Sequence, residues 1–233
     1  MLVEVMPIDG IELTGLASAL ESEDTRQSIR EITQQNYANV PVLLEQEYRK
    51  NNQIYLHRDH DRRIDGFFMV GWDTVAGIEG KTVFLGLSSV AQTAKSKGIG
   101  GKLYRSFFHD AAEHATNTGE TVVWWFHTAT PIVANAIWKI APHVVPTANG
   151  EYAGQDARDI ALIKSSYGMA SFGSENHPFV LRGYAKARYA DDEVNRLGSL
   201  FGQEDHLLRR LSIDERNGDR MLFLGRVFKS VPN

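Results

Sequence analysis

Apolar and aromatic residues form three short runs in the first half of the chain, at residues 53–57, 64–72 and 82–90. The breaks between these runs are short and rich in Asp, Arg and Gly, which are typical of turns. Runs of this length, joined by short polar turns, predict an antiparallel meander of three strands.

Helical spacing of apolar residues occurs on both sides of the meander. Upstream, it predicts a short helix over residues 11–22, a second helix after Asp24 and a third over residues 42–50. Downstream, it predicts an amphipathic helix over residues 101–116, where apolar residues repeat every four positions at Leu103, Phe107, Ala111 and Ala115.

A buried strand is predicted at residues 121–127, whose centre reads Val-Val-Trp-Trp-Phe, and a helix follows at residues 131–140 with proline in its first turn. The meander, one strand–helix–strand crossover and later strands together predict an α/β (α+β) fold with a mixed, mostly antiparallel sheet flanked by helices. The later elements are helices over residues 156–166, 191–201 and 205–211 and strands over residues 179–187 and 221–228.

No repeat or linker divides the 233 residues, so we expect a single domain over residues 1–233, with a core of about 1–150 and an extension over 151–233. The absence of cysteine excludes a disulfide framework, a thiolate zinc site and a cysteine nucleophile. A net charge of −4 without a basic excess argues against a nucleic-acid partner. No apolar run reaches the roughly 18 residues of a membrane helix, and no signal peptide is evident, so we expect a cytoplasmic protein without a membrane partner.

The clearest chemical signal is the glycine loop, residues 95–101, which reads Lys-Ser-Lys-Gly-Ile-Gly-Gly and leads into the amphipathic helix. Glycines leave backbone amides open to a ligand, and a helix N-terminus favours anions, so the loop predicts a pyrophosphate site. A Walker A loop is excluded, because Lys102 is followed by leucine and the upstream glycine position holds Ser96. A dinucleotide fingerprint fails at Leu103, where its third glycine is required.

The segment resembles motif A of the GNAT superfamily of acyl-CoA N-acyltransferases. Val90 takes the motif's upstream valine, Lys95 its arginine position, and Gly98 and Gly100 its two glycines. The resemblance implies the acyl-CoA N-acyltransferase fold with a C-terminal extension, acetyl-CoA or coenzyme A as co-substrate, and no metal. It implies these contacts with CoA: Ser88, Ser89 and Val90 to the pantetheine arm; Lys95, Ser96, Lys97, Gly98, Ile99, Gly100 and Gly101 to the pyrophosphate; and Asn135 from the next helix.

The following helix departs from the family pattern, because Trp138 stands where a tyrosine often protonates the departing thiolate. Indole is no acid near neutral pH, so Trp138 also fits a plain core position, and an acid would come from Tyr152, Tyr167, Tyr184 or water. His127, at the end of the Trp-Trp strand, could deprotonate the amine or could be a structural histidine. Ser88 could polarise a water or could be an ordinary strand residue. The turn holding His57, Asp59, His60 and Asp61 also carries arginines that repel a cation, which favours a solvated turn.

The leading hypothesis is an enzyme that moves an acyl group directly from CoA to an amine. Two alternatives remain: a CoA-binding sensor with weak or no turnover, favoured by Trp138, and an interaction module on the same fold. The acceptor stays open between a small-molecule amine and a peptide amine, and a homodimer is one option for the assembly.

Overall fold

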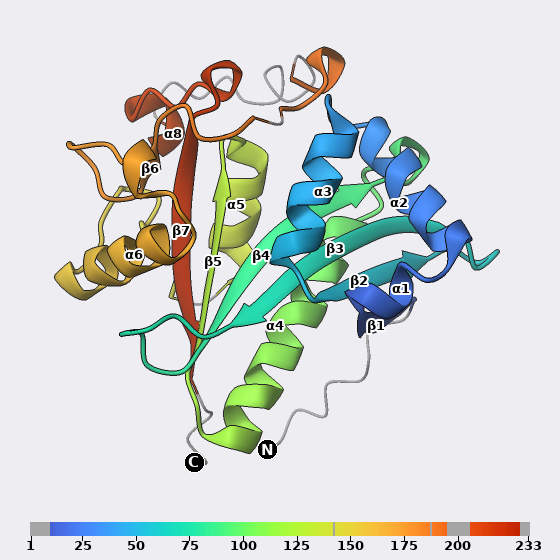
Figure 1. The fold of residues 1–233 in the computed structure, drawn as a ribbon, viewed down its shortest axis with the longest axis horizontal. Coiled ribbons are helices and arrows are strands. Elements are labelled where there is room, and N and C mark those ends of the chain that lie inside the picture. Colours follow the sequence, from blue (N-terminus) through green and yellow to red (C-terminus); the bar gives the residue numbers. More distant parts are fainter. Residues whose placement is uncertain (1–9, 142, 187, 195–205, 229–233) are drawn as a thin grey trace.

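The computed structural model describes residues 10–141, 143–186, 188–194 and 206–228. Within them, seven strands form one sheet in the order β1-β2-β3-β4-β5-β7-β6, with helices on both faces (Figure 1). Neighbouring strands are antiparallel except β4 and β5, which run parallel. The predicted mixed, mostly antiparallel sheet is confirmed. The strands are β1 (Ile11–Gly15), β2 (Gln53–Arg58), β3 (Ile64–Asp73), β4 (Lys81–Val90), β5 (Val122–Thr128), β6 (Val180–Leu181) and β7 (Arg220–Val227).

The helices form a layer on each face of the sheet. The first face packs against α4 and α5, and the second against α1, α2, α3 and α6. None of the described helices is long and apolar enough to cross a bilayer. The α-helices are α1 (Leu16–Ala19), α2 (Glu23–Gln34), α3 (Val40–Lys50), α4 (Ile99–Thr118), α5 (Pro131–Ile140), α6 (Gly154–Ser166) and α8 (Leu207–Arg210); short 3-10 turns are η1 (Gln92–Ala94), η2 (Ala170–Phe172) and η3 (Glu215–Asn217).

Strand β5 explains why the Trp-Trp run reads as continuously apolar. Trp124 packs into the core on the α4 side, while Trp125 packs into the core on the α6 side. Because successive strand residues point to opposite faces, a strand covered on both faces needs apolar residues at every position. The predicted meander, the amphipathic helix, the Trp-Trp strand and the helix after it are all confirmed, with ends that differ by one or two residues.

Three of the elements expected from the sequence are not confirmed. The helix expected over residues 11–22 is wrong: Ile11–Gly15 is an edge strand paired with β2, and only Leu16–Ala19 is helical. The strand expected over residues 179–187 shrinks to Val180–Leu181, because Gly183 turns away with a φ of 61°. Most of the helix expected over residues 191–201 lies outside the described residues.

The parallel strands β4 and β5 separate along their length. They pair only from Lys81 opposite Val122 to Phe84 opposite Trp125. Beyond Phe84, β4 carries one extra residue against β3, because Phe68 pairs with Ser88 while Val70 pairs with Leu85. Such a bulge bends a strand. The two strands therefore diverge toward their carboxyl ends, as the upper part of Figure 1 shows, and the glycine loop follows β4 at that open end.

Candidate functional site

The glycine loop presents the amino terminus of the longest described helix. Gly98 is the N-cap of α4 with a φ of 75°, and Ser96 is also left-handed with a φ of 67°. The first helical bond that crosses this cap joins the Lys102 amide to the Gly98 carbonyl at 3.0 Å. In the described part of the chain, the amides of residues 98–101 have no protein acceptor. The loop therefore has the free donors that an anion site requires.

Space over these amides is open. A Cβ added to Gly98 or Gly100 would meet nothing within 4 Å. A Cβ on Gly101 would lie 3.2 Å from Nη1 of Arg105, so a guanidinium stands beside the loop together with the exposed Lys97. Sequence reasoning missed Arg105, although a residue four positions after Gly101 returns to the same helical face.

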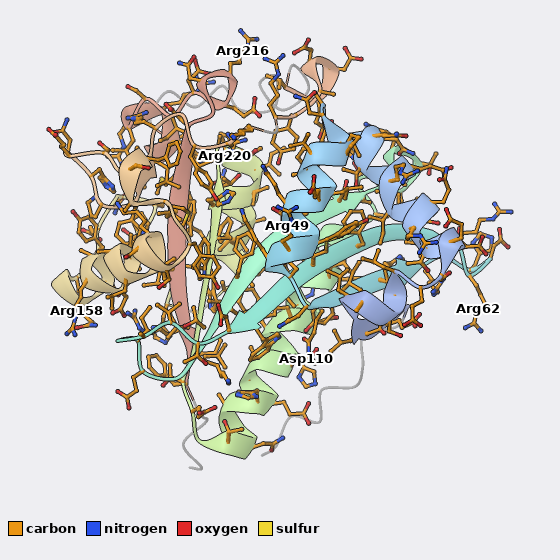
Figure 2. The ribbon with its side chains drawn as sticks, in the orientation of Figure 1. Arg49, Arg62, Asp110, Arg158, Arg216 and Arg220 are labelled. Atoms are coloured by element: carbon orange, nitrogen blue, oxygen red, sulfur yellow. The ribbon has the colours of Figure 1, made fainter. Side chains whose placement is uncertain are left out.

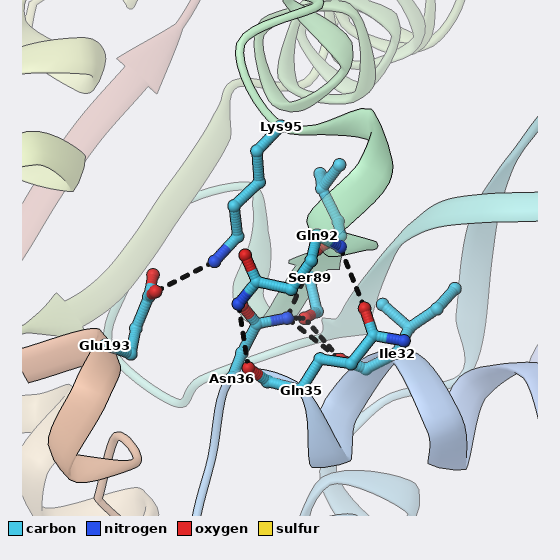
Figure 3. A network of polar contacts seen from close by, with 8 residues as sticks. Ile32, Gln35, Asn36, Ser89, Gln92, Lys95 and Glu193 are labelled. Carbon is cyan, nitrogen blue, oxygen red and sulfur yellow. Dashed lines mark hydrogen bonds and ion pairs between the residues drawn. The ribbon is translucent and has the colours of Figure 1, made fainter. Parts of the chain in front are cut away.

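Two side chains named from the sequence are already engaged within the protein (Figure 3). Lys95 Nζ lies 2.8 Å from Glu193 Oε2, and the Lys95 side chain is only 19% exposed. Asn36 Nδ2 donates to Ser89 Oγ at 2.9 Å, and Ser89 donates to the Ile32 carbonyl at 3.4 Å. The loop's remaining cations are therefore Lys97, Lys102 and Arg105, and residue 89 can offer a ligand only its backbone.

A cavity of about 470 Å³, here the wedge cavity, lies where β4 and β5 have separated. Its walls come from residues 84–88 of β4, residues 126–128 of β5, the inner side of α3, and residues of the C-terminal part. Arg49 from α3 and Arg220 from β7 lie on its two sides (Figure 2). Among the sequence candidates, Ser88, His127, Tyr167 and Tyr184 line it. The fold thus brings together residues that are 96 positions apart.

Ser88 and Tyr104 form a hydroxyl pair on the wall of the wedge cavity. Their oxygens lie 3.0 Å apart, and Tyr104 comes from the first turns of α4. Burial raises the pKa of Tyr104 to about 12, partly offset by its hydrogen bond with Ser88. Tyr104 therefore stays protonated at neutral pH and can donate a hydrogen bond. Sequence reasoning missed it, because it is adjacent to Leu103 on a helix whose buried face was assigned to the core.

Glu47 is a buried carboxylate on the opposite wall. Its Oε2 accepts hydrogen bonds from the Leu87 amide, at the β4 bulge, and from Asn51 Nδ2, both at 3.0 Å. Within the described residues, Oε1 of Glu47 has no hydrogen-bond partner. This atom keeps some contact with solvent. Burial raises the pKa of Glu47, against the charge of Lys50 and the two hydrogen bonds. Its sequence signal was a charged residue on the apolar stripe formed by Leu43 and Leu44.

His127 contacts aromatic rings on both sides, with Phe84 at 5.9 Å and Tyr184 at 5.2 Å between ring centroids. Both ring nitrogens are buried, and neither has a partner among the described residues. Burial, then the charges of Lys50 and Arg220, lowers the pKa of His127 to about 3. The imidazole is therefore neutral at physiological pH and a weak base.

The remaining candidates lie outside the wedge cavity. Trp138 donates its indole N–H to the Pro146 carbonyl at 2.9 Å and packs edge-on against Phe223, which suits a core residue. Tyr152 is 40% exposed and packs on Phe179. Asn135 is half-buried on α5 and does not line the cavity. Asp59 Oδ1 accepts two backbone amides of its own exposed turn at 2.9 Å, as a turn-capping residue does.

No protein-family model matches the chain, and no curated protein matches it either. Solved structures similar to it include acetyltransferases. The IAA acetyltransferase from Bacillus cereus is 11% identical, with 93% of this chain and 99% of that chain covered and a TM-score of 0.45. The ribosomal-protein-S18-alanine N-acetyltransferase from Escherichia coli is also 11% identical, with 96% and 97% covered and a TM-score of 0.43.

A GNAT family acetyltransferase from Elizabethkingia anophelis with acetyl-CoA bound is 15% identical, with 56% of this chain and 74% of that chain covered and a TM-score of 0.39. At these identities the similarity is one of fold, and the chemistry depends on the residues of the site itself.

Proposed function

We propose that this protein is an acyl-CoA-dependent N-acyltransferase of the GNAT type, which moves an acetyl or longer acyl group directly to an amine. One observation carries the proposal: the glycine loop and the wedge cavity open at the same end of β4. An anion site next to a gap between two parallel strands suits a ligand with a pyrophosphate and an extended amide-bearing arm.

In this proposal the amides of residues 98–101 hold the pyrophosphate, and Lys97 and Arg105 add positive charge. The pantetheine arm follows the edge of β4 that β5 leaves unpaired, along the backbone of residues 88–90. Lys95 contributes only if its ion pair with Glu193 opens. The resemblance also implies contacts of Ser96, Ile99 and Asn135 with CoA, and of these Asn135 lies on α5 outside the wedge cavity.

The proposed reaction needs a neutral amine, while a primary amine with a pKa near 10 is protonated at pH 7. Glu47 is the better-suited base, since its Oε1 is unpaired and burial raises its pKa toward the working pH. His127, with a pKa of about 3, is a much weaker acceptor for that proton. Glu47 accepts one proton from the ammonium, and the neutral nitrogen then bonds to the acyl carbon while the carbon–sulfur bond breaks. The second nitrogen proton passes to the departing thiolate, so that CoA leaves as the free thiol.

The departing sulfur carries negative charge as a thiolate. The hydroxyl pair of Ser88 and Tyr104 lines the wedge cavity on the β4 side and can donate a hydrogen bond there. A phenol with a pKa of about 12 stabilises the thiolate by hydrogen bonding, because it is a weaker acid than a thiol with a pKa near 8.5. This arrangement needs no tyrosine at position 138.

The test is release of free thiol from acetyl-CoA against a panel of amines, with the wild type beside Glu47→Gln. Glutamine keeps an oxygen for the Leu87 and Asn51 hydrogen bonds but cannot take a proton. We expect amine-dependent thiol release that falls on the order of 10²-fold or more in Glu47→Gln, the usual contribution of a general base. Tight CoA binding with no thiol release for any amine would instead support the CoA-sensor alternative.

A further inference from the structure

The wall of the wedge cavity carries more positive than negative side chains. Four of its lining residues are cationic, namely Arg49, Lys50, Lys186 and Arg220, and among the described lining residues Glu47 is the one carboxylate. Arg49 and Arg220 have carboxylate partners in Glu45 and Glu215. Lys50 has none within 4 Å among the described residues.

Lys50 is held inside the cavity by aromatic side chains. Its Nζ donates to Tyr184 Oη at 3.3 Å and lies 5.8 Å from the ring centroids of both Phe84 and Tyr184. An ammonium has three N–H donors, and this contact uses one. The positive charge of Lys50 acts across the cavity on His127, because Lys50 and Arg220 both help to lower the pKa of that histidine. Lys50 therefore offers unused donors and a net positive potential to a ligand.

Lys50 and Glu47 are three residues apart on α3, so their side chains leave the helix on the same face. No ion pair within 4 Å joins them, since Glu47 is bonded to Asn51 and Leu87 and Lys50 to Tyr184. The cavity thus displays one negative and one positive group side by side, each with capacity left for a ligand.

We propose that the acceptor is an amine that carries a carboxylate, of the amino-acid type: its amino group faces Glu47, and Lys50 with Tyr184 binds its carboxylate. This rests on the proposed acyltransferase function and names its acceptor class. Phe84, Phe172 and Tyr167 supply apolar wall for the body of the molecule. A volume of about 470 Å³ is in the range of small-molecule sites.

The experiment compares matched acceptors: alanine, leucine and phenylalanine, each as the free acid and as the amide, with thiol release from acetyl-CoA as readout. The amides keep the side chain and amine but lose the carboxylate. For the best side chain, we expect kcat/KM to favour the free acid by at least about 10-fold, as for a charge-assisted hydrogen bond. The preference should appear mainly in KM.

Lys50→Gln should bring the ratio of free acid to amide close to one, whereas Lys139→Gln, an exposed change on α5 outside the cavity, should keep the wild-type ratio. A preference for the amides, an unchanged ratio in Lys50→Gln, or turnover of other amines but of no free acid would overturn the acceptor assignment. Failure to bind CoA, or CoA binding with no thiol release for any amine, would overturn the proposed function itself, so the two failures are distinct.

Discussion

A carboxylate placed in the glycine loop should abolish CoA binding without harming the fold. Gly100 is the position to change, because it lies within the first turn of α4 and its added Cβ would meet nothing within 4 Å. Gly98 is less suitable, since its φ of 75° would add backbone strain to any substitution. An aspartate in a first helical turn is favourable for the helix itself.

The magnitude follows from Coulomb's law. A carboxylate about 5 Å from one pyrophosphate charge, at an effective dielectric constant of about 20, costs roughly 3 kcal/mol. That corresponds to an increase in the Kd of CoA of about two orders of magnitude. The steric clash between the aspartate side chain and the pyrophosphate would raise the Kd further.

The assay is calorimetric titration of CoA into the wild type, Gly100→Asp and Gly154→Asp. Gly154 is a matched control, because it also lies in the first turn of a helix, α6, with nothing within 4 Å of an added Cβ. We expect binding to be lost only in Gly100→Asp, with unchanged thermal unfolding in both variants. Wild-type affinity in Gly100→Asp would refute the assignment of the loop as the pyrophosphate site.

Other predictions concern the proton, the thiolate and the core. Glu47 has a raised pKa, so its stabilising contribution is present at low pH and lost as the pH rises through the raised pKa. In urea titrations, the unfolding free energy of Glu47→Gln relative to the wild type should therefore grow as the pH rises above the ordinary carboxyl pKa of 4.5, and a constant difference would contradict the raised pKa. Turnover should rise with pH along one limb as Glu47 ionises, and in Glu47→Gln the limb should move toward the acceptor's own pKa. Tyr104→Phe should lower kcat on the order of 10-fold and leave the Kd of CoA nearly unchanged in stopped-flow and titration measurements, because the phenol acts on the thiolate; an unchanged kcat would remove it from the mechanism. Gly225→Ala should cost about 1–3 kcal/mol in urea unfolding, since its Cβ would lie 2.0 Å from Trp124 Cζ2, while Gly15→Ala, with open space, should be near neutral.

Much of the fold could be predicted because periodicity and turn residues were unambiguous where the chain is packed on both sides. Trp124 and Trp125 make a continuous apolar run only because both faces of β5 are covered. The edge strand β1 was misread as a helix, since its one neighbour is β2 and its burial alternation is weak, with Leu13 44% exposed. A strand that is specified mainly by pairing with its neighbour has only a weak pattern of apolar and polar residues in its own sequence.

In the candidate site, too, the locally determined part could be predicted from the sequence, and the part that depends on long-range contacts could not. The glycine loop is local, so the spacing of Gly98 and Gly100 was enough to predict an anion site there, and the structure places this loop at the open end of β4. The wedge cavity depends on a bulge in β4 and on contacts across the chain, such as Glu47 to Leu87, 40 positions apart. The sequence left His127 open between a base and a structural histidine, because the burial that lowers its pKa comes from Phe84 and Tyr184, which are distant in sequence.

In the proposed mode of binding, one ligand spans the glycine loop and the gap between β4 and β5. Parallel calorimetric titrations of the wild type with CoA, ADP and NADH test it most directly, because all three carry a pyrophosphate and only CoA carries pantetheine. We expect CoA to bind at least about 10-fold more tightly than ADP or NADH, since amide pairing along β4 adds to the pyrophosphate contacts. Equal affinities for the three ligands, or no binding of CoA, would contradict it.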